Sequence, residues 1–287
     1  MLKRVDRLQM VVPDRAKAAA GWAGVLGAEP ESEDRIKCLG AERSTWRAGS
    51  SRIEFLSPDG AGKVQDALSA RGAHLFAAGL ATEDFDGLMA HLGTRGVKPV
   101  IEAGQAFLDG AATGGFGMQV VISPESELPA VGKIDFFYET TLLVHDAPAR
   151  VAECAKLFGL DMDNFVPIGS ADYGYEGTLT LFRARHLDRF EIITPTVAEK
   201  TMGRYFARFG QGYYMAFAES GSLPAIEETL KAAGLGHTVE PYDGPSGRIA
   251  DTIFVHPPVL GGMMLGISRR TKAWQWSGHP DWVEEPK

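Results

Sequence analysis

The residues with the clearest chemical potential stand at matching places in two similar stretches of the chain. Arg7 opens one stretch and Glu139 opens the other, and a later segment that closes each copy begins with a glutamate, Glu54 or Glu191. An arginine beside a carboxylate forms an ion pair. Two carboxylates close together in a partly dry place repel each other, which raises the pKa of one and leaves it able to move a proton.

Each copy continues as a helical pattern that a glycine ends. Both copies place an aspartate seven residues after the first position and a glycine thirteen residues later, as Asp14 with Gly27 and Asp146 with Gly159. An aspartate can accept hydrogen bonds from the free N–H groups of a helix start, and glycine supplies a left-handed stop. We predict helices over residues 15–26 and 147–157, and we interpret the two copies as a duplication.

The same order of elements, β-α-β-β-β, is predicted four times along the chain. In the first unit the return strands are expected near residues 36–39, 45–48 and 53–56. The second unit is expected to have a strand at 75–82, a helix from 84 to 92 and strands at 97–101, 105–108 and 118–122. The third has return strands at 178–184 and 189–193; the fourth has a strand at 213–219, a helix at 223–233 and strands at 237–240, 249–255 and 263–267. Helix-prone linkers, 64–71 and 195–209, separate the units within each half.

Residues 124–132 are polar, contain proline and end in glycine, which marks a domain boundary. We predict an N-terminal domain over residues 1–124 (modules 1–57 and 74–124), a C-terminal domain over 133–270 (modules 133–195 and 212–268) and a tail over 271–287. Three tryptophans, Trp274, Trp276 and Trp282, indicate that the tail packs back on the body, although an exposed tail is the alternative.

Composition narrows the class of protein. The chain has 287 residues, of which 45% are hydrophobic, so it can bury a core. The net charge of −8 and the pI near 5.4 argue against nucleic acid or an anionic membrane as partner. No apolar run approaches the ~20 residues that span a bilayer, the charged N-terminus has no signal-peptide pattern, and Cys38 and Cys154 are too few for a disulfide framework. We expect a cytoplasmic protein that binds a small molecule, and we leave a homodimer open.

Four such units in series resemble the vicinal oxygen chelate (glyoxalase/bleomycin resistance/extradiol dioxygenase) superfamily over nearly the whole chain. The resemblance rests on the strand that leads to the helix-capping Asp, on the helix ends Leu26-Gly27 and Phe158-Gly159, and on the closing Glu-x-x-x-Pro strands. It implies an α+β fold in which four βαβββ modules pair into two glyoxalase-like cup or barrel domains. In that family the cup holds the site.

The resemblance also implies where metal ligands would stand. Metal-dependent members usually carry a His on the first strand of a module and a Glu on the last, because a divalent cation needs several donors in one shell. The first module has Arg7 and Glu54 there; Arg has no lone pair to offer a metal, so we expect a structural ion pair. The second module is apolar at these positions, and His74 could enter only by a register shift.

The third and fourth modules depart from the family pattern in other ways. The third has carboxylates, Glu139 and Glu191, at both positions. The fourth has Tyr214 (Met215 if the register shifts by one) in place of His and Gly266 in place of Glu. We therefore expect a member with degenerate metal ligands and no assigned cofactor. If a divalent metal is bound, Glu139 and Glu191 are the candidates to hold it.

The repulsion between two carboxylates that face one cup can be relieved in three ways. A divalent cation or a nearby arginine could neutralise them, they could share a proton, or the cup could be wet enough for two ordinary carboxylates. Arg189 stands two residues before Glu191, and so shares its face on an extended strand. It is therefore a candidate to neutralise the pair.

Three functions remain open at this stage. The first is an enzyme that acts in the C-terminal cup on a small aromatic or oxygenated metabolite by isomerase- or lyase-type proton transfer. Glu139 or Glu191 would move the proton and Tyr214 would bond the developing oxyanion. The expected substrate-binding residues are Tyr175, His186, Arg189, Met215 and Phe217.

The alternative is a non-catalytic protein that binds or sequesters a small molecule, as bleomycin-resistance members do. A second alternative is a metal-dependent extradiol-type dioxygenase or glyoxalase with shifted ligands. Because two ionisable residues stand where the family does its chemistry, we favour an enzyme.

Overall fold

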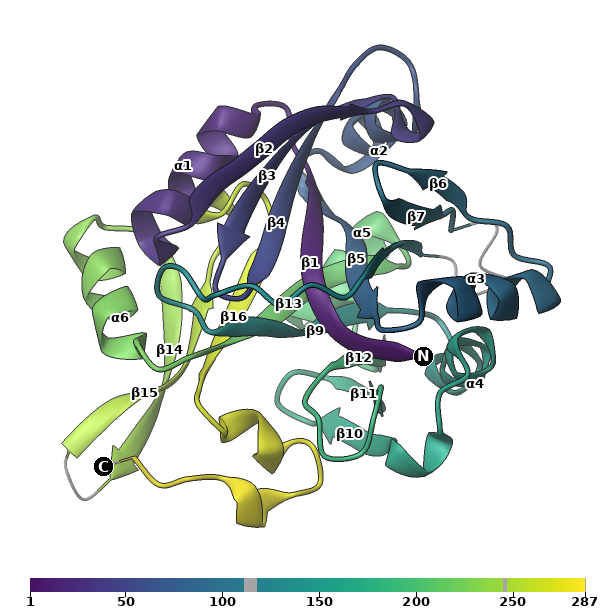
Figure 1. Cartoon of the computed structure of the whole chain (residues 1–287). Coiled ribbons are helices and arrows are strands. Elements are labelled where there is room, and N and C mark those ends of the chain that lie inside the picture. Colours follow the sequence, from purple (N-terminus) through teal and green to yellow (C-terminus); the bar gives the residue numbers. More distant parts are fainter. Residues whose placement is uncertain (111–117, 245–246, 287) are drawn as a thin grey trace. The chain divides into compact units, whose positions relative to one another are not determined.

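The computed structural model describes residues 1–110, 118–244 and 247–286 (Figure 1). The first module comprises β1 (Leu2–Val11), α1 (Arg15–Leu26), β2 (Glu29–Ile36), β3 (Ala41–Ala48) and β4 (Ser51–Pro58). The second comprises β5 (His74–Thr82), α3 (Phe85–Thr94), β6 (Val100–Glu102), β7 (Gln105–Leu108) and β8 (Gln119–Pro124). Helix α2 (Lys63–Arg71) links these two modules.

The C-terminal half has the same arrangement. The third module comprises β9 (Phe136–Leu143), α4 (Ala147–Phe158), β10 (Val166–Ser170), β11 (Tyr175–Leu181) and β12 (Arg189–Pro195). The fourth comprises β13 (Gly212–Ser220), α6 (Leu223–Ala232), β14 (His237–Gly244), β15 (Gly247–Val255) and β16 (Met264–Arg269), after the linking helix α5 (Thr201–Phe209). The predicted α+β fold of four βαβββ modules is confirmed.

The strands form two eight-stranded sheets of matching topology. One sheet has the order β2-β3-β4-β1-β5-β8-β7-β6 and the other has the order β10-β11-β12-β9-β13-β16-β15-β14. Within each described pair, the first strand of a module runs parallel to its last strand, as β1 with β4 and β9 with β12. In the described part of the chain, no helix combines the length and apolar character that crossing a bilayer requires.

The predicted helix caps are confirmed where the two copies are most alike. Asp14 accepts a hydrogen bond from the backbone N of Lys17 at 2.9 Å, and Asp146 accepts one from Ala149 at 3.0 Å. Gly27 and Gly159 end the helices with φ of 70° and 62°, in the left-handed region that glycine tolerates. These local signals place the first strand of each module before its helix.

The chain divides into two compact units, each discontinuous in sequence. The first unit consists of Met1–Val5, Ala77–Ser126 and Glu139–Tyr214, and the second of Asp6–Phe76, Glu127–Tyr138 and Met215–Lys287. In the first unit α3 packs against α4, and in the second α1 packs against α6. The domain boundary predicted over residues 124–132 stays a prediction.

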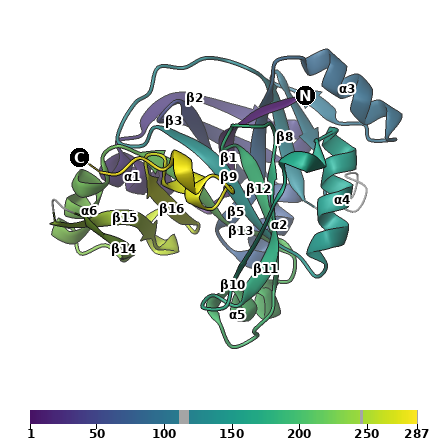
Figure 2. The ribbon, with the colours of Figure 1, turned by 90° about the horizontal axis from the view of Figure 1, so that it is seen from below.

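In the first unit, α4 covers one face of β11 and β12 (Figure 2). Phe158 of α4 lies 6.1 Å from Phe190 of β12, measured between ring centroids. Side chains alternate between the faces of a strand, so the neighbours of Phe190, Arg189 and Glu191, point to the opposite face. We call this face, which carries Arg189 and Glu191, the cup face of the third module.

In the second unit, Trp22 of α1 is fully buried and packs edge-on against two rings. Its ring centroid lies 6.4 Å from that of Phe55 and 5.9 Å from that of Phe137. The indole Nε1 donates a hydrogen bond to the carbonyl of Leu260 at 3.1 Å. The helix therefore approaches the segment around Leu260 closely.

Two edge strands differ from the prediction. Residues 36–39 are not a strand, because β2 occupies Glu29–Ile36 and a 3₁₀ turn follows at Lys37–Leu39. Strand β10, Val166–Ser170, has no counterpart among the predicted elements. Both β2 and β10 are edge strands, and β2 is exposed in all but its last residue. Because β2 is exposed on both faces, it has no apolar alternation to reveal it.

The tail packs back on the second unit over its described residues, as predicted. Asp251 accepts a hydrogen bond from Arg269 Nε at 2.9 Å and pairs with Lys272 at the start of the tail. The ring of Trp276 lies 6.1 Å from that of Phe217. The tryptophans of the tail are therefore part of a packed structure, at least through Trp276.

The close approach of α1 gives a matched pair of glycine substitutions. A Cβ at Gly21 would overlap the carbonyl oxygen of Val259, whereas a Cβ at Gly24 would meet nothing within 4 Å. We expect Gly21→Ala to destabilise the fold by about 1–3 kcal/mol because the helix must shift. Gly24→Ala should stabilise it by roughly 0.5–1 kcal/mol through helix propensity. Urea unfolding midpoints measure both, and equal effects would contradict the described packing.

Candidate functional site

The cup face of the third module carries the two predicted carboxylates. Strands β9 and β12 are parallel neighbours, with Glu139 opposite Arg189 and Thr141 opposite Glu191 in the register. Paired residues on neighbouring strands point to the same face. The fold therefore brings four polar side chains together, two from each strand.

These four side chains form a closely bonded cluster, which we call the carboxylate cluster (Glu139, Thr141, Arg189 and Glu191). Arg189 Nε donates to Glu139 Oε2 at 2.6 Å. Thr141 Oγ1 donates to Glu191 Oε2 at 2.5 Å and lies 3.5 Å from Glu139 Oε1. The relative exposures of Arg189, Glu139 and Glu191 are 1%, 3% and 7%. The cluster is therefore dry enough for its charges to interact strongly.

The cluster has two carboxylates but one guanidinium. Burial, together with the charge of Glu139, raises the pKa of Glu191 to about 8. The hydrogen bond from Thr141 and the charge of Arg189 act in the opposite direction and are outweighed. The raised pKa places the proton of the pair on Glu191. At neutral pH the pair therefore retains one proton.

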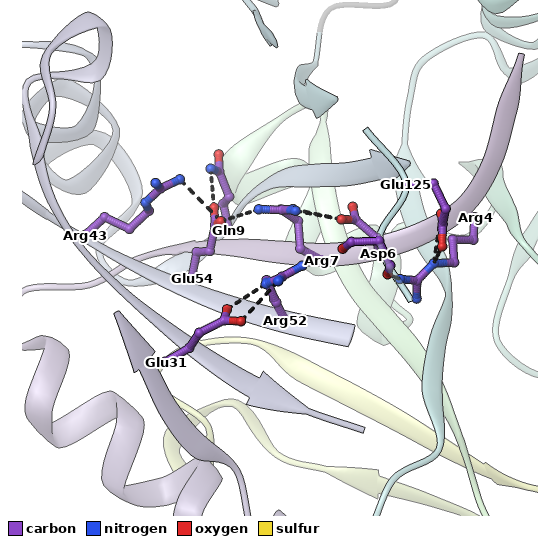
Figure 3. Close-up of polar contacts among 10 residues, drawn as sticks. Arg4, Asp6, Arg7, Gln9, Glu31, Arg43, Arg52, Glu54 and Glu125 are labelled. Atoms are coloured by element: carbon purple, nitrogen blue, oxygen red, sulfur yellow. Dashed lines mark hydrogen bonds and ion pairs between the residues drawn. The ribbon is translucent and has the colours of Figure 1, made fainter. Parts of the chain in front are cut away.

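The first module has the counterpart of this cluster, in the second unit (Figure 3). Arg7 Nη1 lies 2.7 Å from Glu54 Oε1, and Gln9 Nε2 donates to Glu54 Oε2 at 2.7 Å. Arg43 Nη1 approaches Glu54 Oε1 at 3.3 Å, and Arg7 also pairs with Asp6 at 2.7 Å. The structure thus places Arg7 and Glu54 in the expected ion pair, within a larger network.

The pKa of the glutamate in this network is shifted in the opposite direction to that of Glu191 in the carboxylate cluster. Burial by itself would raise the pKa of Glu54, but the charges of Arg7 and Arg43 and the hydrogen bond from Gln9 lower it to about 2. Burial by itself would lower the pKa of Arg7, but the charges of Asp6 and Glu54 and the hydrogen bonds to them raise it. Glu54 is therefore ionised throughout the neutral range, and its role is to pair with arginine.

The fourth module offers no donor at its matching positions. Phe217 lies opposite Gly266 in the register, as Thr141 lies opposite Glu191, so Met215 rather than Tyr214 corresponds to Glu139. This is the register shift that the sequence left open. A Cβ at Gly266 would overlap the ring of Phe217. An aromatic ring therefore fills the space where a glutamate side chain would begin.

Tyr214 points to the opposite face of β13 from Met215, because side chains alternate along a strand. Its ring lies 5.1 Å from that of Tyr205 in α5. Burial raises the pKa of Tyr214 to about 12, which makes its phenol a weaker acid. This placement does not favour the oxyanion-binding role expected for Tyr214.

The predicted substrate-binding residues Tyr175, His186 and Arg189 lie at different distances from the carboxylate cluster. Tyr175 is on the same face of β11 as Leu179, which lies opposite Glu191, but it is four residues, or ~13 Å, farther along the strand. His186 is exposed in the turn before β12, with Nδ1 3.4 Å from Arg183 Nη2. Arg189 alone of this set is shown in contact with a carboxylate of the cluster.

Phe217 lies at the centre of an aromatic cluster in the second unit, which we define as Tyr138, Phe217, Phe254 and Trp276. The centroid of the Phe217 ring is 6.1 Å from Tyr138, 5.9 Å from Phe254 and 6.1 Å from Trp276. Phe217, Phe254 and Trp276 are each half-buried. The hydroxyl of Tyr138 lies 3.1 Å from that of Ser268.

Sequence reasoning missed several of these residues. Thr141 could have been found, because it stands two residues after Glu139 and so shares its face. Phe254, Ser268 and Arg43 could not, since their neighbours come from distant return strands. No local signal in the sequence fixes the register of those strands.

The residues present do not fit the metal shell that the fold family implies. Over the described ranges, no group of three or more His, Cys, Asp or Glu side chains is arranged to hold a metal ion. In the carboxylate cluster Glu139 is bonded to Arg189, whose positive charge would repel a divalent cation. In the fourth module Met215 and Gly266 provide neither an oxygen nor a nitrogen side-chain donor.

The pKa values of Glu191 and Glu54 are shifted in opposite directions, which predicts opposite effects of pH on folding stability. The raised pKa of Glu191 means that Glu191 binds its proton more tightly in the folded state than in the unfolded state. Its contribution to folding stability is therefore fully present below the ordinary glutamate pKa of 4.5 and is lost as pH rises towards 8. We expect Glu191→Gln to stabilise the protein at pH 9 by on the order of 1 kcal/mol or more, and to change little at pH 5. Urea unfolding at the two pH values measures the difference.

Glu54→Gln is the matched control, with the opposite sign. In the unaltered protein the lowered pKa of Glu54 contributes folding stability that is fully present above pH 4.5 and is lost as pH falls through about 2. We expect a destabilisation of roughly 3 kcal/mol at pH 7 that shrinks in acid. Parallel behaviour of the two variants would contradict the charge balance described above.

Comparisons with known proteins agree with this architecture. Residues 6–115 match the family model described as Glyoxalase/Bleomycin resistance protein/Dioxygenase superfamily. No curated protein sequence matches the chain.

Two solved structures are similar in fold. A triple mutant of 4-hydroxymandelate synthase from Streptomyces coelicolor has a TM-score of 0.71 and 13% identity, over 98% of this chain and 99% of that one. A xylose isomerase-like TIM barrel/4-hydroxyphenylpyruvate dioxygenase fusion protein has a TM-score of 0.62 and 13% identity, over 94% of this chain and 49% of that one. The chain therefore has the two-domain vicinal oxygen chelate fold of these structures, and its residues 6–115 are similar to the glyoxalase/bleomycin resistance/dioxygenase family.

Proposed function

We propose that this glyoxalase/dioxygenase-type protein is an enzyme that moves a proton next to an oxygen function of a small metabolite. The carboxylate cluster supplies the acid–base group. The single observation that carries the proposal is the buried pair of Glu139 and Glu191, which has one guanidinium, bonded to Glu139, and in which the pKa of Glu191 is raised. A buried carboxylate pair that retains a proton near neutral pH is suited to general acid–base catalysis.

The roles of the two carboxylates follow from their partners. Arg189 donates a hydrogen bond to the carboxylate of Glu139, to which we assign the role of the base. Glu191 accepts from Thr141 and holds the proton, which makes it the acid. Glu139 takes a proton from a carbon beside a carbonyl, and Glu191 gives its proton to the carbonyl oxygen. The resulting enol can collapse by isomerisation, epimerisation or lyase-type cleavage.

The neighbours of the pair favour a small substrate with apolar parts. Leu179 of β11 lies opposite Glu191, and Leu143 and Ile193 pair on the same face farther along β9 and β12. All three are buried. Apolar neighbours keep water away from the carboxylates, which strengthens their interaction with a polar group of the substrate.

The aromatic cluster favours a second candidate function, a protein that binds an aromatic molecule without changing it. Phe217, Phe254 and Trp276 are half-buried rings that can stack on a planar ligand, and Met215 and Gly266 beside them carry no ionisable group. On this hypothesis the ligand would bind tightly and be recovered unchanged. Both candidates name a small molecule as the partner of the chain.

A metal-dependent dioxygenase or glyoxalase with shifted ligands remains the third candidate. The donor set described above argues against it. Elemental analysis of the purified protein tests it directly. One equivalent of iron, manganese, nickel or zinc per chain would replace the metal-free proposal with this candidate.

The proposal predicts solvent exchange at carbon. We expect the protein to exchange protons for deuterium in D₂O at the carbon beside the carbonyl in a member of a panel of small aldehydes, ketones and 2-oxo acids, with and without an aromatic ring. Proton NMR follows the loss of the C–H signal. Glu139→Gln and Glu191→Gln should each slow exchange by about 10²-fold or more, since each removes one proton-transfer group.

Glu176→Gln is the matched control for this experiment, because Glu176 is exposed on β11 and its side chain points away from the cup face. Exchange that persists in both Glu139→Gln and Glu191→Gln would contradict the acid–base role of the carboxylate cluster. A ligand that binds to the protein but shows no exchange would favour the binding protein instead.

A pH profile tests the shared proton separately. The active form has one carboxylate ionised and one protonated, so the exchange rate should fall as pH rises through about 8, where the pair loses its proton. A rate that keeps rising from pH 7 to pH 10 would show that no protonated carboxylate is needed.

A further inference from the structure

Two modules of the chain each join their first and last strands through a buried arginine and a buried glutamate. In the third module a guanidinium on the last strand, Arg189, bonds the carboxylate of Glu139 on the first strand at 2.6 Å. In the first module a guanidinium on the first strand, Arg7, bonds the carboxylate of Glu54 on the last strand at 2.7 Å. The direction is reversed, but each module places a buried guanidinium–carboxylate pair across the same two strands.

The two pairs differ in what surrounds them. Glu54 has a second guanidinium, that of Arg43, at 3.3 Å. Arg189 faces two carboxylates, because Glu191 is linked to Glu139 through the hydroxyl of Thr141. The carboxylate cluster therefore contains two carboxylates and a hydroxyl in bonding contact, and Arg189 is the cation bonded to one of the carboxylates, Glu139.

Two carboxylates and a hydroxyl are all oxygen donors, which hard divalent cations prefer. Such a group, buried and without a positive charge, would attract a cation from solution or take up protons. Arg189 is 1% exposed and lies within the fold, so its charge is present whenever the chain is folded. A guanidinium stays protonated at all ordinary pH values.

We propose that Arg189 is a positioning residue that takes the electrostatic place of a divalent metal ion in the carboxylate cluster. It holds Glu139 as the anion and keeps divalent cations from binding there. Arg189 is therefore not a substrate-binding residue, which is the role expected from the sequence. The inference concerns the same cluster as the proposed function, but it makes a claim about cation binding that does not depend on turnover.

The inference predicts that removing the guanidinium creates a cation site. We expect Arg189→Met, which keeps an unbranched side chain of similar length without its charge, to bind one Mn²⁺ per chain at least tenfold more tightly than the unaltered protein. Isothermal titration calorimetry and Mn²⁺ electron paramagnetic resonance measure the affinity and the stoichiometry. The double variant Arg189→Met with Glu191→Gln should lose the gain, because one of the two carboxylates is gone.

Two further variants serve as controls. Arg189→Lys keeps a positive charge, and should stay as insensitive to Mn²⁺ as the unaltered protein. Arg52 holds the same register position in the first module as Arg189 does in the third, but it pairs with Glu31 at 2.6 Å. Arg52→Met should therefore give no gain in Mn²⁺ affinity.

The experiment also gives a result if Arg189→Met does not fold in the absence of metal. A buried carboxylate pair without its cation is costly, and metal binding to the folded state would offset that cost. If Arg189→Met is unfolded, Mn²⁺ at millimolar concentration should restore its circular dichroism spectrum. No gain in affinity and no refolding would overturn the inference, as would stoichiometric Mn²⁺ binding by the unaltered protein. Loss of exchange in Glu191→Gln would still support the proposed function in either case.

Discussion

The burial of negative charge is the constraint on which the two modules with charged cup faces depend. An ionised carboxylate inside a protein needs a positive partner or a proton, because the medium around it screens poorly. The first module supplies two arginines to Glu54, and the pKa of this residue falls to about 2. The third module supplies one arginine to two glutamates, and the pKa of Glu191 rises to about 8. The same strands and register therefore produce an inert ion pair in one copy and a proton-holding pair in the other.

This difference separates a scaffold from a candidate site within one duplicated architecture. The backbone positions are equivalent, since Gln9 lies opposite Glu54 as Thr141 lies opposite Glu191. What changes is the balance of charge on a single face of two neighbouring strands. A function assigned on fold alone would not distinguish the two modules, whereas a count of buried charges does.

Much of the architecture was predictable because its signals are local. Asp14 with Gly27 and Asp146 with Gly159 mark helix starts and stops within a few residues, and their repetition reveals the modules. Edge strand β2 lacks such signals because it is exposed in all but its last residue, and the five-residue β10 contains Pro167 and Gly169, which are uncommon inside strands. The two carboxylates of the third module were predictable from the repeat, but Tyr214 was assigned a place that the register gives to Met215. Register depends on pairing between strands far apart in sequence, which a single sequence does not record.

The ring of Phe217 over Gly266 has a consequence for how this chain could change. A glutamate introduced at position 266 would meet the ring before it could reach the cup, so that substitution alone would disturb the strand pair. A smaller residue at position 217 alone would leave a void beside the glycine without adding a donor. A return to a metal-binding fourth module therefore requires at least two coordinated substitutions, of which each is unfavourable on its own. Packing makes the departure from the family pattern difficult to reverse in single steps.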